Sequence, residues 1–293
     1  MTAITDTPQT PAEVLPPKQS RVWAKLRRNV AAMFGAGIVC TFVVIALLAP
    51  FLPIPGPAET DWGAVRKAPS AAHWLGTDEL GRDILSRMIW GARASLLAGV
   101  VSVAIALAIG IPLGVLAGYC RGWTDAIISR ITEALLAAPF LILAIALAAF
   151  LGPSLTNAMI AIGLSAVPIF IRLARAQTML VVTEDYVEGA HAIGLSHPAI
   201  IGRYVLPNIV PPLLVQATLT IATAIIAEAS LSFLGLGQQP PAPSWGSMLN
   251  TAKAFLEQAP WMALWPGIAI FLVVLGFNLF GDGLRDALDP RDN

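Results

Sequence analysis

Long uncharged runs of apolar residues constrain the fold of this 293-residue chain more than any other feature. About 20 apolar residues are enough for a helix to cross the hydrocarbon core of a bilayer. Three runs of that length contain no charged side chain, and three more are shorter or flanked by charge: 30–52, 94–118, 259–281, 134–151, 155–171 and 209–227. Because 56% of the chain is hydrophobic and only 12% is charged, a soluble domain is excluded. The sequence predicts an all-α integral membrane protein with six transmembrane helices.

The distribution of basic residues orients these helices. With six spans, both termini face the same side, and twelve of the 18 Lys and Arg residues fall on that side. Five of the twelve directly precede the first span: Lys18, Arg21, Lys25, Arg27 and Arg28. Basic residues are enriched in cytoplasmic segments, so both termini are predicted to be cytoplasmic. After the first span, 30–52, this assigns 53–93 to an extracytoplasmic loop and 94–283 to a core domain. Residues 1–29 and 284–293 become cytoplasmic tails.

The N-terminal residues do not resemble a cleaved leader. Residues 1–17 are rich in proline and lack apolar periodicity, which is typical of a disordered tail. The apolar run that follows is too long for a signal peptide, so the first span is interpreted as an uncleaved anchor. Cys40 lies within that span and Cys120 near a cytoplasmic end, so no disulfide is expected.

The first extracytoplasmic loop carries a helical pattern in its second half. Thr77 is placed to cap a helix with Asp78 and Glu79 in its first turn, and apolar residues then recur at helical spacing. The pattern predicts an amphipathic helix along the outer surface. Such a helix either packs at the lipid interface or offers a platform to a partner that docks from outside.

The second extracytoplasmic segment, 237–258, opens with the sequence QQPPAPSWG. Its prolines prevent helix continuation and predict a rigid, extended cap. Trp245, Trp261 and Trp265 are expected at the extracytoplasmic interface of the membrane, where indole rings concentrate.

No catalytic or cofactor-binding constellation is evident in the sequence. The three histidines, His73, His191 and His197, have no cysteine nearby and no His-x3-His spacing, which argues against a metal site. None of the four lysines follows a glycine, so the Gly-Lys step of a P-loop is absent. We expect the chain to bind no cofactor and no nucleic acid, and to be no enzyme. If transport is driven by ATP, another subunit must supply the nucleotide site.

Two carboxylates fall within predicted spans, where an unpaired charge is costly. Glu133 follows Arg130 by three residues, so the two side chains share a helix face, and Glu133 is expected to be paired or to face water. Glu228 lies toward the extracytoplasmic end of the fifth span. Either it lines a water-filled path, or it makes a hydrogen bond between helices. Both acids are candidates for a translocation path.

Glycines and prolines recur inside the predicted spans at Gly110, Pro112, Gly114, Pro139 and Pro168. Small residues let helices approach closely, and prolines kink them. Both uses fit a bundle that bends between states.

The polar segment 184–207 separates two apolar runs and is longer than a simple turn requires. It is predicted to form a short helix over 185–193, a break at Gly194, a second short helix capped by Ser196, and a restart at Pro207. Thr183 is expected to cap the first helix. A nine-residue helix is not stable alone in water, so the membrane base or another protein must hold it. This indicates cytoplasmic docking of a partner protein.

The same segment resembles the EAA loop of bacterial ATP-binding-cassette importer permeases, written EAA-x3-G-x9-I-x-L-P. The matching residues are Glu188, Gly189, Ala190, Gly194, Leu206 and Pro207. Gly189 replaces the central alanine of that motif, and Tyr204 replaces its isoleucine. Three further stretches, 73–96, 228–249 and 281–291, resemble the peptide/nickel subfamily of these permeases, in particular the second permease subunits of dipeptide and oligopeptide importers.

The resemblance implies a type I importer permease of the bacterial inner membrane that moves peptides or similar solutes by alternating access. It implies four partners besides membrane lipid: a homologous permease, two cassette ATPases that bind ATP and Mg²⁺, and an extracytoplasmic substrate-binding protein. The EAA loop would form the coupling helix on one ATPase. Glu188 would pair there, Ala190 would allow close packing, and Gly194 would permit the turn.

Two other functions are compatible with a polytopic membrane protein. A proton-coupled secondary carrier would use Glu133 and Glu228, but such carriers often show internal repeats, and no convincing repeat is present. A non-transporting scaffold or sensor would leave solute uptake unchanged when deleted.

Overall fold

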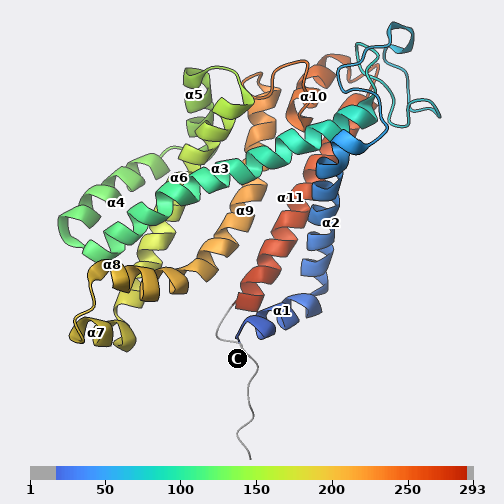
Figure 1. The fold of residues 1–293 in the computed structure, drawn as a ribbon. Coiled ribbons are helices and arrows are strands. Elements are labelled where there is room, and N and C mark those ends of the chain that lie inside the picture. Colours follow the sequence, from blue (N-terminus) through green and yellow to red (C-terminus); the bar gives the residue numbers. More distant parts are fainter. Residues whose placement is uncertain (1–17, 289–293) are drawn as a thin grey trace, which may run out of the picture.

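The computed structural model describes residues 18–288 of the chain, with side chains from residue 22 onward. The predicted tail 1–17 and residues 289–293 of the predicted C-terminal tail lie outside the described residues. Regular structure in the described part is helical, apart from one isolated bridge between Thr77 and Asp83 (Figure 1). The helices are α1 (Lys18–Arg28), α2 (Val30–Leu48), α3 (Ile84–Cys120), α4 (Gly122–Leu136), α5 (Phe140–Leu151), α6 (Leu155–Val182), α7 (Asp185–Ala192), α8 (His197–Ile200), α9 (Leu206–Phe233), α10 (Trp245–Ala252) and α11 (Trp261–Leu288).

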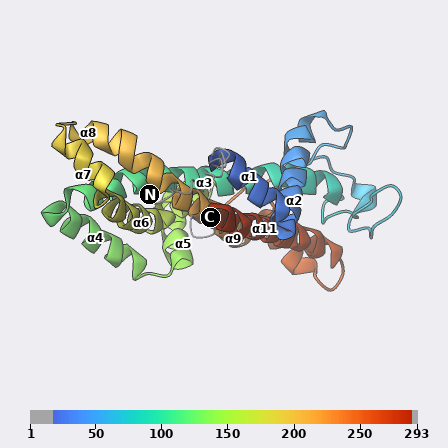
Figure 2. The same ribbon diagram turned by 90° about the horizontal axis from the view of Figure 1, so that it is seen from below.

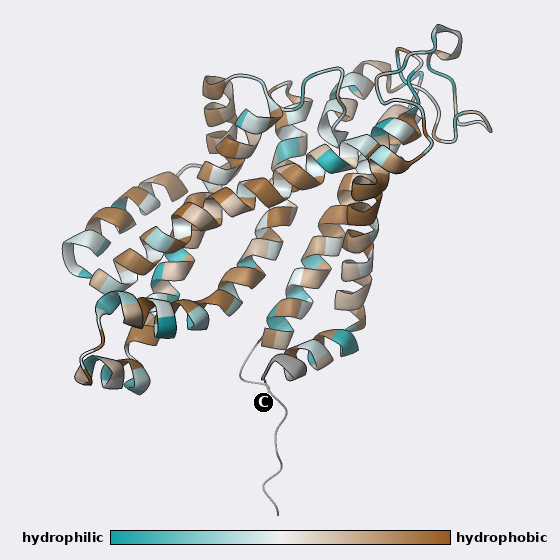
Figure 3. Cartoon of the chain, in the orientation of Figure 1, coloured by the Kyte–Doolittle hydropathy of each residue, from teal (hydrophilic) through white to brown (hydrophobic). Residues whose placement is uncertain are grey.

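Five helical stretches of the described chain are long and apolar enough to cross a membrane. They are Val30–Phe51, Ile84–Cys120, Leu155–Val182, His197–Phe233 and Trp261–Leu288. The pair α4 and α5 passes the same test but is bent by 91°, and Pro139 stands at the bend as the N-cap of α5. Pro112 and Pro168 lie inside α3 and α6, which continue unbroken. The six predicted spans are accounted for when the bent pair counts as one, and Figure 3 shows hydrophobic residues along the long helices.

Different elements lie at the two ends of the bundle. Helices α1 and α7 and the last turn of α11 lie at one end, which we call the α7 end (Figure 1). Helix α10 and residues 52–83 lie at the opposite end, which we call the loop end. The segment 184–207 therefore shares an end with the described parts of both termini, as six spans require. The cytoplasmic orientation of that end stays a prediction.

Helices α3 and α6 form the closest pair in the bundle. Gly110, Gly114 and Gly118 follow one another at four-residue spacing along α3 and face α6. A Cβ atom at Gly114 would lie 2.6 Å from the carbonyl oxygen of Ile171, and one at Gly118 would lie 2.7 Å from that of Arg175. Such short distances mean that the two backbones are in direct contact. The packing role predicted for Gly110 and Gly114 is confirmed.

The predicted start of the amphipathic helix at Thr77 is wrong. Residues 77–83 form a turn closed by the bridge between Thr77 and Asp83, and α3 begins directly after Asp83. Asp83 caps α3, since its Oδ2 accepts the N–H of Ser86 at 2.8 Å. Asp78 accepts two backbone N–H groups of the turn through Oδ1, which competes with helix formation. The apolar periodicity after the turn therefore belongs to the first turns of a spanning helix.

The predicted extended cap over 237–258 is also only partly correct. Its proline stretch is non-helical, but Ser244 and Ser247 then form a capping box and start α10. Trp245 is fully buried, and its ring N–H donates to the carbonyl of Met88 at 3.1 Å. The expectation that Trp245 lies at the membrane interface is therefore wrong. Its ring lies against Phe42 of α2 and the backbone of α3, which are distant in the sequence.

The two other tryptophans at this end hold the first loop in place. Trp261 and Trp265, on the first turns of α11, donate their ring N–H groups to the carbonyls of Thr77 and Leu75, each at 3.2 Å. Both side chains are half-buried. Their contact with lipid headgroups stays a prediction.

Candidate docking site

Helix α7 projects from the bundle between α6 and α8 (Figures 1 and 2). It ends in a Schellman turn: the N–H of Gly194 bonds to the carbonyl of His191 at 3.0 Å, and the N–H of Leu195 to that of Ala190 at 3.2 Å. Gly194 has φ of +81°, a conformation that side chains with Cβ rarely adopt. The predicted helix, break and role of Gly194 in the turn are confirmed.

The two sides of α7 have opposite environments. Val187 and Ala190 are 0% and 3% exposed and belong to the main hydrophobic core. The opposite side is exposed, and we call it the docking face: Asp185, Glu188, Gly189, Ala192 and Ile193. A Cβ atom at Gly189 would meet no atom of this chain within 4 Å. The helix is thus anchored on one side and free of neighbours from its own chain on the other.

The predicted site residues divide between these sides. Glu188 and Gly189 lie on the docking face, and Gly194 lies at the exposed turn beside it. Ala190 faces the core of its own chain, so in this conformation its small side chain serves packing within the bundle. Leu206 is half-buried against the same core, and Pro207 is exposed.

The predicted second short helix is not a separate element. From His197 to Phe233 the chain is helical throughout, with a π-helical turn over Ile201–Val205. In that turn the N–H of Leu206 bonds to the carbonyl of Ile201, five residues back. Pro207 lacks an N–H, and its ring crowds the preceding turn of an α-helix. The wider turn accommodates this proline without breaking the helix, which is why no restart occurs at Pro207.

Neither capping residue predicted for the segment makes a side-chain cap. The hydroxyl of Thr183 donates to the carbonyl of Leu180 at 2.8 Å, so it serves the end of α6. Ser196 occupies the N-cap position of α8 without a side-chain hydrogen bond. Pro198, in the first turn of α8, presets the helical φ there, so the helix starts without that bond.

Tyr204, which replaces the isoleucine of the EAA pattern, contacts a residue of α7. The ring of Tyr204 packs against that of Tyr186 on α7, with centroids 6.3 Å apart. Partial burial raises the pKa of Tyr186, and the charge of Glu184 raises it further. The larger side chain at 204 therefore contacts α7 directly.

The two acids within the spans have different surroundings. Glu228 on α9 is fully buried; Ser95 of α3 donates to its Oε2 at 3.0 Å and Ser232 to its Oε1 at 2.7 Å. The hydrogen bond between helices, one of the two alternatives, is therefore present. Glu133 on α4 is exposed and pairs with Arg130 at 3.4 Å, as their spacing predicted. A role for either acid in a translocation path stays a prediction.

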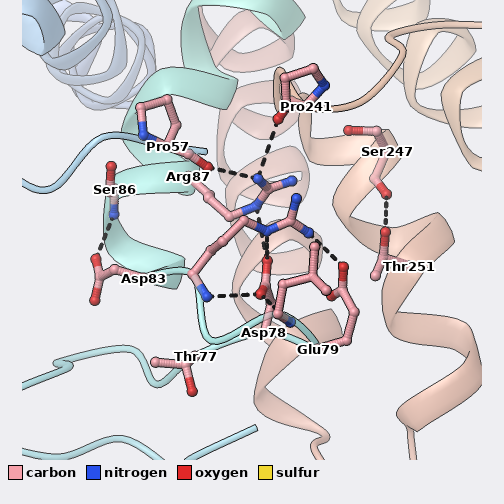
Figure 4. Close-up of polar contacts among 12 residues, drawn as sticks. Pro57, Thr77, Asp78, Glu79, Asp83, Ser86, Arg87, Pro241, Ser247 and Thr251 are labelled. Atoms are coloured by element: carbon pink, nitrogen blue, oxygen red, sulfur yellow. Dashed lines mark hydrogen bonds and ion pairs between the residues drawn. The ribbon is translucent and has the colours of Figure 1, made fainter. Parts of the chain in front are cut away.

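A buried ionic cluster at the loop end was not anticipated from the sequence (Figure 4). Arg82 lies 2.6 Å from Asp78 through Nε and 2.5 Å from Glu79 through Nη2. Arg87 Nε lies 3.3 Å from the same oxygen of Asp78. Asp78, Arg82 and Arg87 are all less than a tenth exposed. The four-residue spacing of Asp78 and Arg82 is a signal for this ion pair, although the same acids also fit the first turn of a helix.

The cluster joins loops that are distant in the sequence. Arg87 Nη1 donates to the carbonyl of Pro57 at 2.8 Å and lies 3.4 Å from that of Pro241. Burial raises the pKa of Glu79, and the neighbouring charge of Asp78 raises it further. His73, the histidine of this end, pairs with Asp83 at 3.1 Å. Between residues 18 and 288, no group of three His, Cys, Asp or Glu side chains is arranged to hold a metal.

Comparisons with known proteins agree with this architecture. Residues 110–292 match the family model described as binding-protein-dependent transport system inner membrane component. Residues 20–69 match the N-terminal TM domain of oligopeptide transport permease C.

Relatives cover almost the whole chain. The dipeptide transport system permease protein DppC of Alkalihalophilus pseudofirmus is 47% identical over 91% of this chain and 88% of its own length. The glutathione transport system permease protein GsiD of Escherichia coli is 48% identical over 92% of this chain and 89% of its own. A chain of the MetNI methionine ABC transporter, solved in inward-facing conformations, shares the fold. It has a TM-score of 0.59 and 22% identity and covers 70% of this chain and 98% of its own length.

Proposed function

The chain belongs to the family of inner membrane components of binding-protein-dependent transport systems, and on that premise we propose that its docking face couples it to a cytoplasmic cassette ATPase. The chain is a multi-pass permease subunit of an ABC importer in the bacterial inner membrane, and it is not an enzyme. ATP and Mg²⁺ bind to the separate ATPase subunits. The α7 end then faces the cytoplasm.

One observation carries the proposal. Helix α7 buries Val187 and Ala190 in its own core, while the docking face on its other side has no neighbour from its own chain. An eight-residue helix is too short to be stable by its own hydrogen bonds. A second protein that covers the docking face completes its support, and Glu188 and Gly189 then lie in the contact.

The transported solute is a short peptide. Relatives that match almost the full length are named for dipeptide and for glutathione transport, and both solutes carry amide bonds and terminal charges. The complete importer contains a homologous second permease, two cassette ATPases and an extracytoplasmic substrate-binding protein that delivers the peptide to the loop end.

The mechanism is alternating access driven by differential docking. ATP binding can bias the bundle only if the ATPase holds α7 differently in the inward-open and outward-open states. Displacement of α7 acts on α6, which precedes it, and on the continuous helix His197–Phe233, which follows it. No observation on the described residues supports a proton-coupled carrier or a non-transporting scaffold to the same degree.

Substitution of Gly189 by Phe tests the proposal directly. The site has free space around its Cβ position, and any residue but proline favours a helix over glycine, so the permease itself folds normally. The added ring blocks the docking face. We expect loss of ATPase co-purification and at least a ten-fold fall in peptide uptake. Gly267→Phe on α11 is the matched control, because its Cβ position is equally free of neighbours. Normal ATPase binding and uptake by Gly189→Phe would overturn the proposal.

Reversal of the charge at Glu188 tests the polar part of the contact. The side chain is exposed, so Glu188→Lys costs little in the isolated permease. We expect a lower ratio of peptide uptake to ATP hydrolysis, with an intermediate ratio for Glu188→Gln, which loses only the charge. Identical ratios in all three proteins would show that this charge is not used.

A further inference from the structure

Three rings from three helices meet where the ends of α3, α7 and α8 come together. The hydroxyl of Tyr119, near the end of α3, lies 2.7 Å from Nδ1 of His197 at the start of α8. It also lies 3.5 Å from Nε2 of His191 on α7. The two imidazole centroids are 5.5 Å apart, and that of Tyr119 is 5.6 Å from His197 and 6.4 Å from His191. We call these three residues the Tyr119 cluster.

The hydrogen bonding of the Tyr119 cluster follows from its geometry. The shorter distance fits the phenolic O–H donating to Nδ1 of His197. The oxygen keeps a lone pair for the longer contact with His191. One hydroxyl thus bridges the two short helices on either side of the Gly194 turn.

Tyr119 is held firmly by the helix that carries it. It directly follows Gly118, where α3 lies against the backbone of α6: a Cβ at Gly118 would approach the carbonyl oxygen of Arg175 to 2.7 Å. The hydroxyl of Tyr119 therefore extends from the most closely packed helix pair in the bundle.

Few other contacts hold α7 and α8 against the rest of the bundle. Val187 and Ala190 fix α7 to the core, and the chain connects α7 to α6 before it and to α8 after it. On α7, His191 follows Ala190 directly and borders the buried side of the helix rather than the docking face. The Tyr119 cluster is the contact, among the described hydrogen bonds, by which α3 reaches both α7 and α8.

We propose that Tyr119 is a positioning residue that ties the docking segment to α3, so that an ATPase moving α7 displaces α3, α6 and α9 together. This inference rests on the proposed function of the docking face. The chain connects α7 to α6 and, through α8, to α9, and the direct packing of α6 on α3 moves α3 together with α6. The Tyr119 cluster adds a direct tie from α7 and α8 to α3, so that the docking segment keeps its orientation on this helix pair when the ATPase moves it.

The experiment uses the complete importer reconstituted in liposomes with its binding protein. Tyr119→Phe removes the hydroxyl and keeps the ring. We expect an ATPase complement equal to wild type and a roughly five-fold fall in peptide uptake per ATP hydrolysed, as for a lost hydrogen bond of about 1 kcal/mol. Tyr186→Phe is the matched control, because the ring of Tyr186 packs on Tyr204 and no described hydrogen bond uses its hydroxyl. An unchanged ratio in Tyr119→Phe would overturn the proposal.

A double-mutant cycle separates positioning from general stability. His197→Ala should lower the ratio as Tyr119→Phe does, and the double variant should be no worse than either single one, because all three lack the same bond. His197→Asn, whose Oδ1 can accept a hydrogen bond from the phenolic O–H, should restore most of the ratio. Additive losses in the double variant, or no rescue by His197→Asn, would refute the role of this bond.

ATPase co-purification distinguishes failure of this inference from failure of the proposed function. If Tyr119→Phe or His197→Ala abolishes ATPase binding, the cluster belongs to the partner contact and the positioning role is wrong, while docking at α7 stands. If Gly189→Phe leaves docking intact, the proposed function itself fails, and the positioning role falls with it.

Discussion

The ionic cluster of the loop end and the docking face of the α7 end contrast in whether their charged groups are paired within the chain. At the loop end, Asp78, Arg82 and Arg87 are buried and bonded to one another, and Arg87 also donates to a distant loop. At the α7 end, Glu188 and the rest of the docking face have no partner among the described residues. The loop end is therefore shaped by its own chain, whereas the docking face is, in our proposal, covered by an ATPase.

The contrast fits the proposed function. A loop end that receives solute from a substrate-binding protein would need to keep one shape, and buried ion pairs that share several hydrogen bonds can fix such a shape. An α7 end that docks on an ATPase would need to respond to changes in the conformation of that ATPase. A short helix with one anchored side and one free side can be held differently in two states.

Removal of the Asp78 carboxylate should destabilise the loop end, and this is the largest of the expected effects. Asp78→Ala leaves Arg82 and Arg87 buried with Glu79 as their one remaining carboxylate in the cluster. A broken buried ion pair costs about 3–5 kcal/mol. We expect rapid proteolysis between residues 53 and 83 and a clearly lower Tm in detergent. Glu257→Ala removes an exposed acid at the same end that makes no described side-chain hydrogen bond or ion pair, and it should change Tm little. Equal Tm values for the two variants would contradict the contrast between the ends.

Substitution of Gly194 should affect the α7 end without unfolding the permease. Its Cβ position is free of neighbours, so Gly194→Val introduces only backbone strain of about 1–3 kcal/mol at the positive φ. We expect normal membrane levels and a several-fold lower ratio of uptake to ATP hydrolysis. Gly194→Asn should retain most of the coupling, because asparagine tolerates this conformation. Full coupling in the valine variant would argue against a required turn at 194.

Titration of Glu79 should change the stability of the loop end with pH, and this is the smallest of the expected effects. Burial and the charge of Asp78 raise its pKa in the folded protein above the unfolded value. Its contribution to stability is therefore fully present below the unfolded pKa and is lost as pH rises through the folded pKa. Compared with Glu79→Gln, the wild-type loop end should lose protection against amide hydrogen exchange as pH rises through that interval. Parallel pH profiles for the two proteins would exclude this titration.

Sequence reasoning succeeded where structure depends on neighbouring residues. The spans follow from apolar composition, and the turn at Gly194 follows from a glycine placed after one helical stretch and before another. The pairing of Arg130 with Glu133 follows from helical spacing. Each of these features is decided within a few residues of the chain.

It failed where a distant segment decides the outcome. Trp245 is buried because α3 supplies the carbonyl of Met88, which its own surroundings do not reveal. The residues after Thr77 carry helix-favouring charges, yet Asp78 is bound by Arg82 and Arg87 in a turn. The contact of Tyr119 with two histidines more than 70 positions away is equally invisible to local patterns.

The π-helical turn before Pro207 contains about one residue more than a turn of the α-helix on either side. Successive residues of an α-helix are rotated by about 100°, so excision of a single residue here would swing α8 around the axis of α9 by roughly that amount. The direction of α7 and α8 relative to α9 is thus set by the number of residues in this turn. A homologue with an unbroken α-helix here would present its docking face on a different side of the bundle.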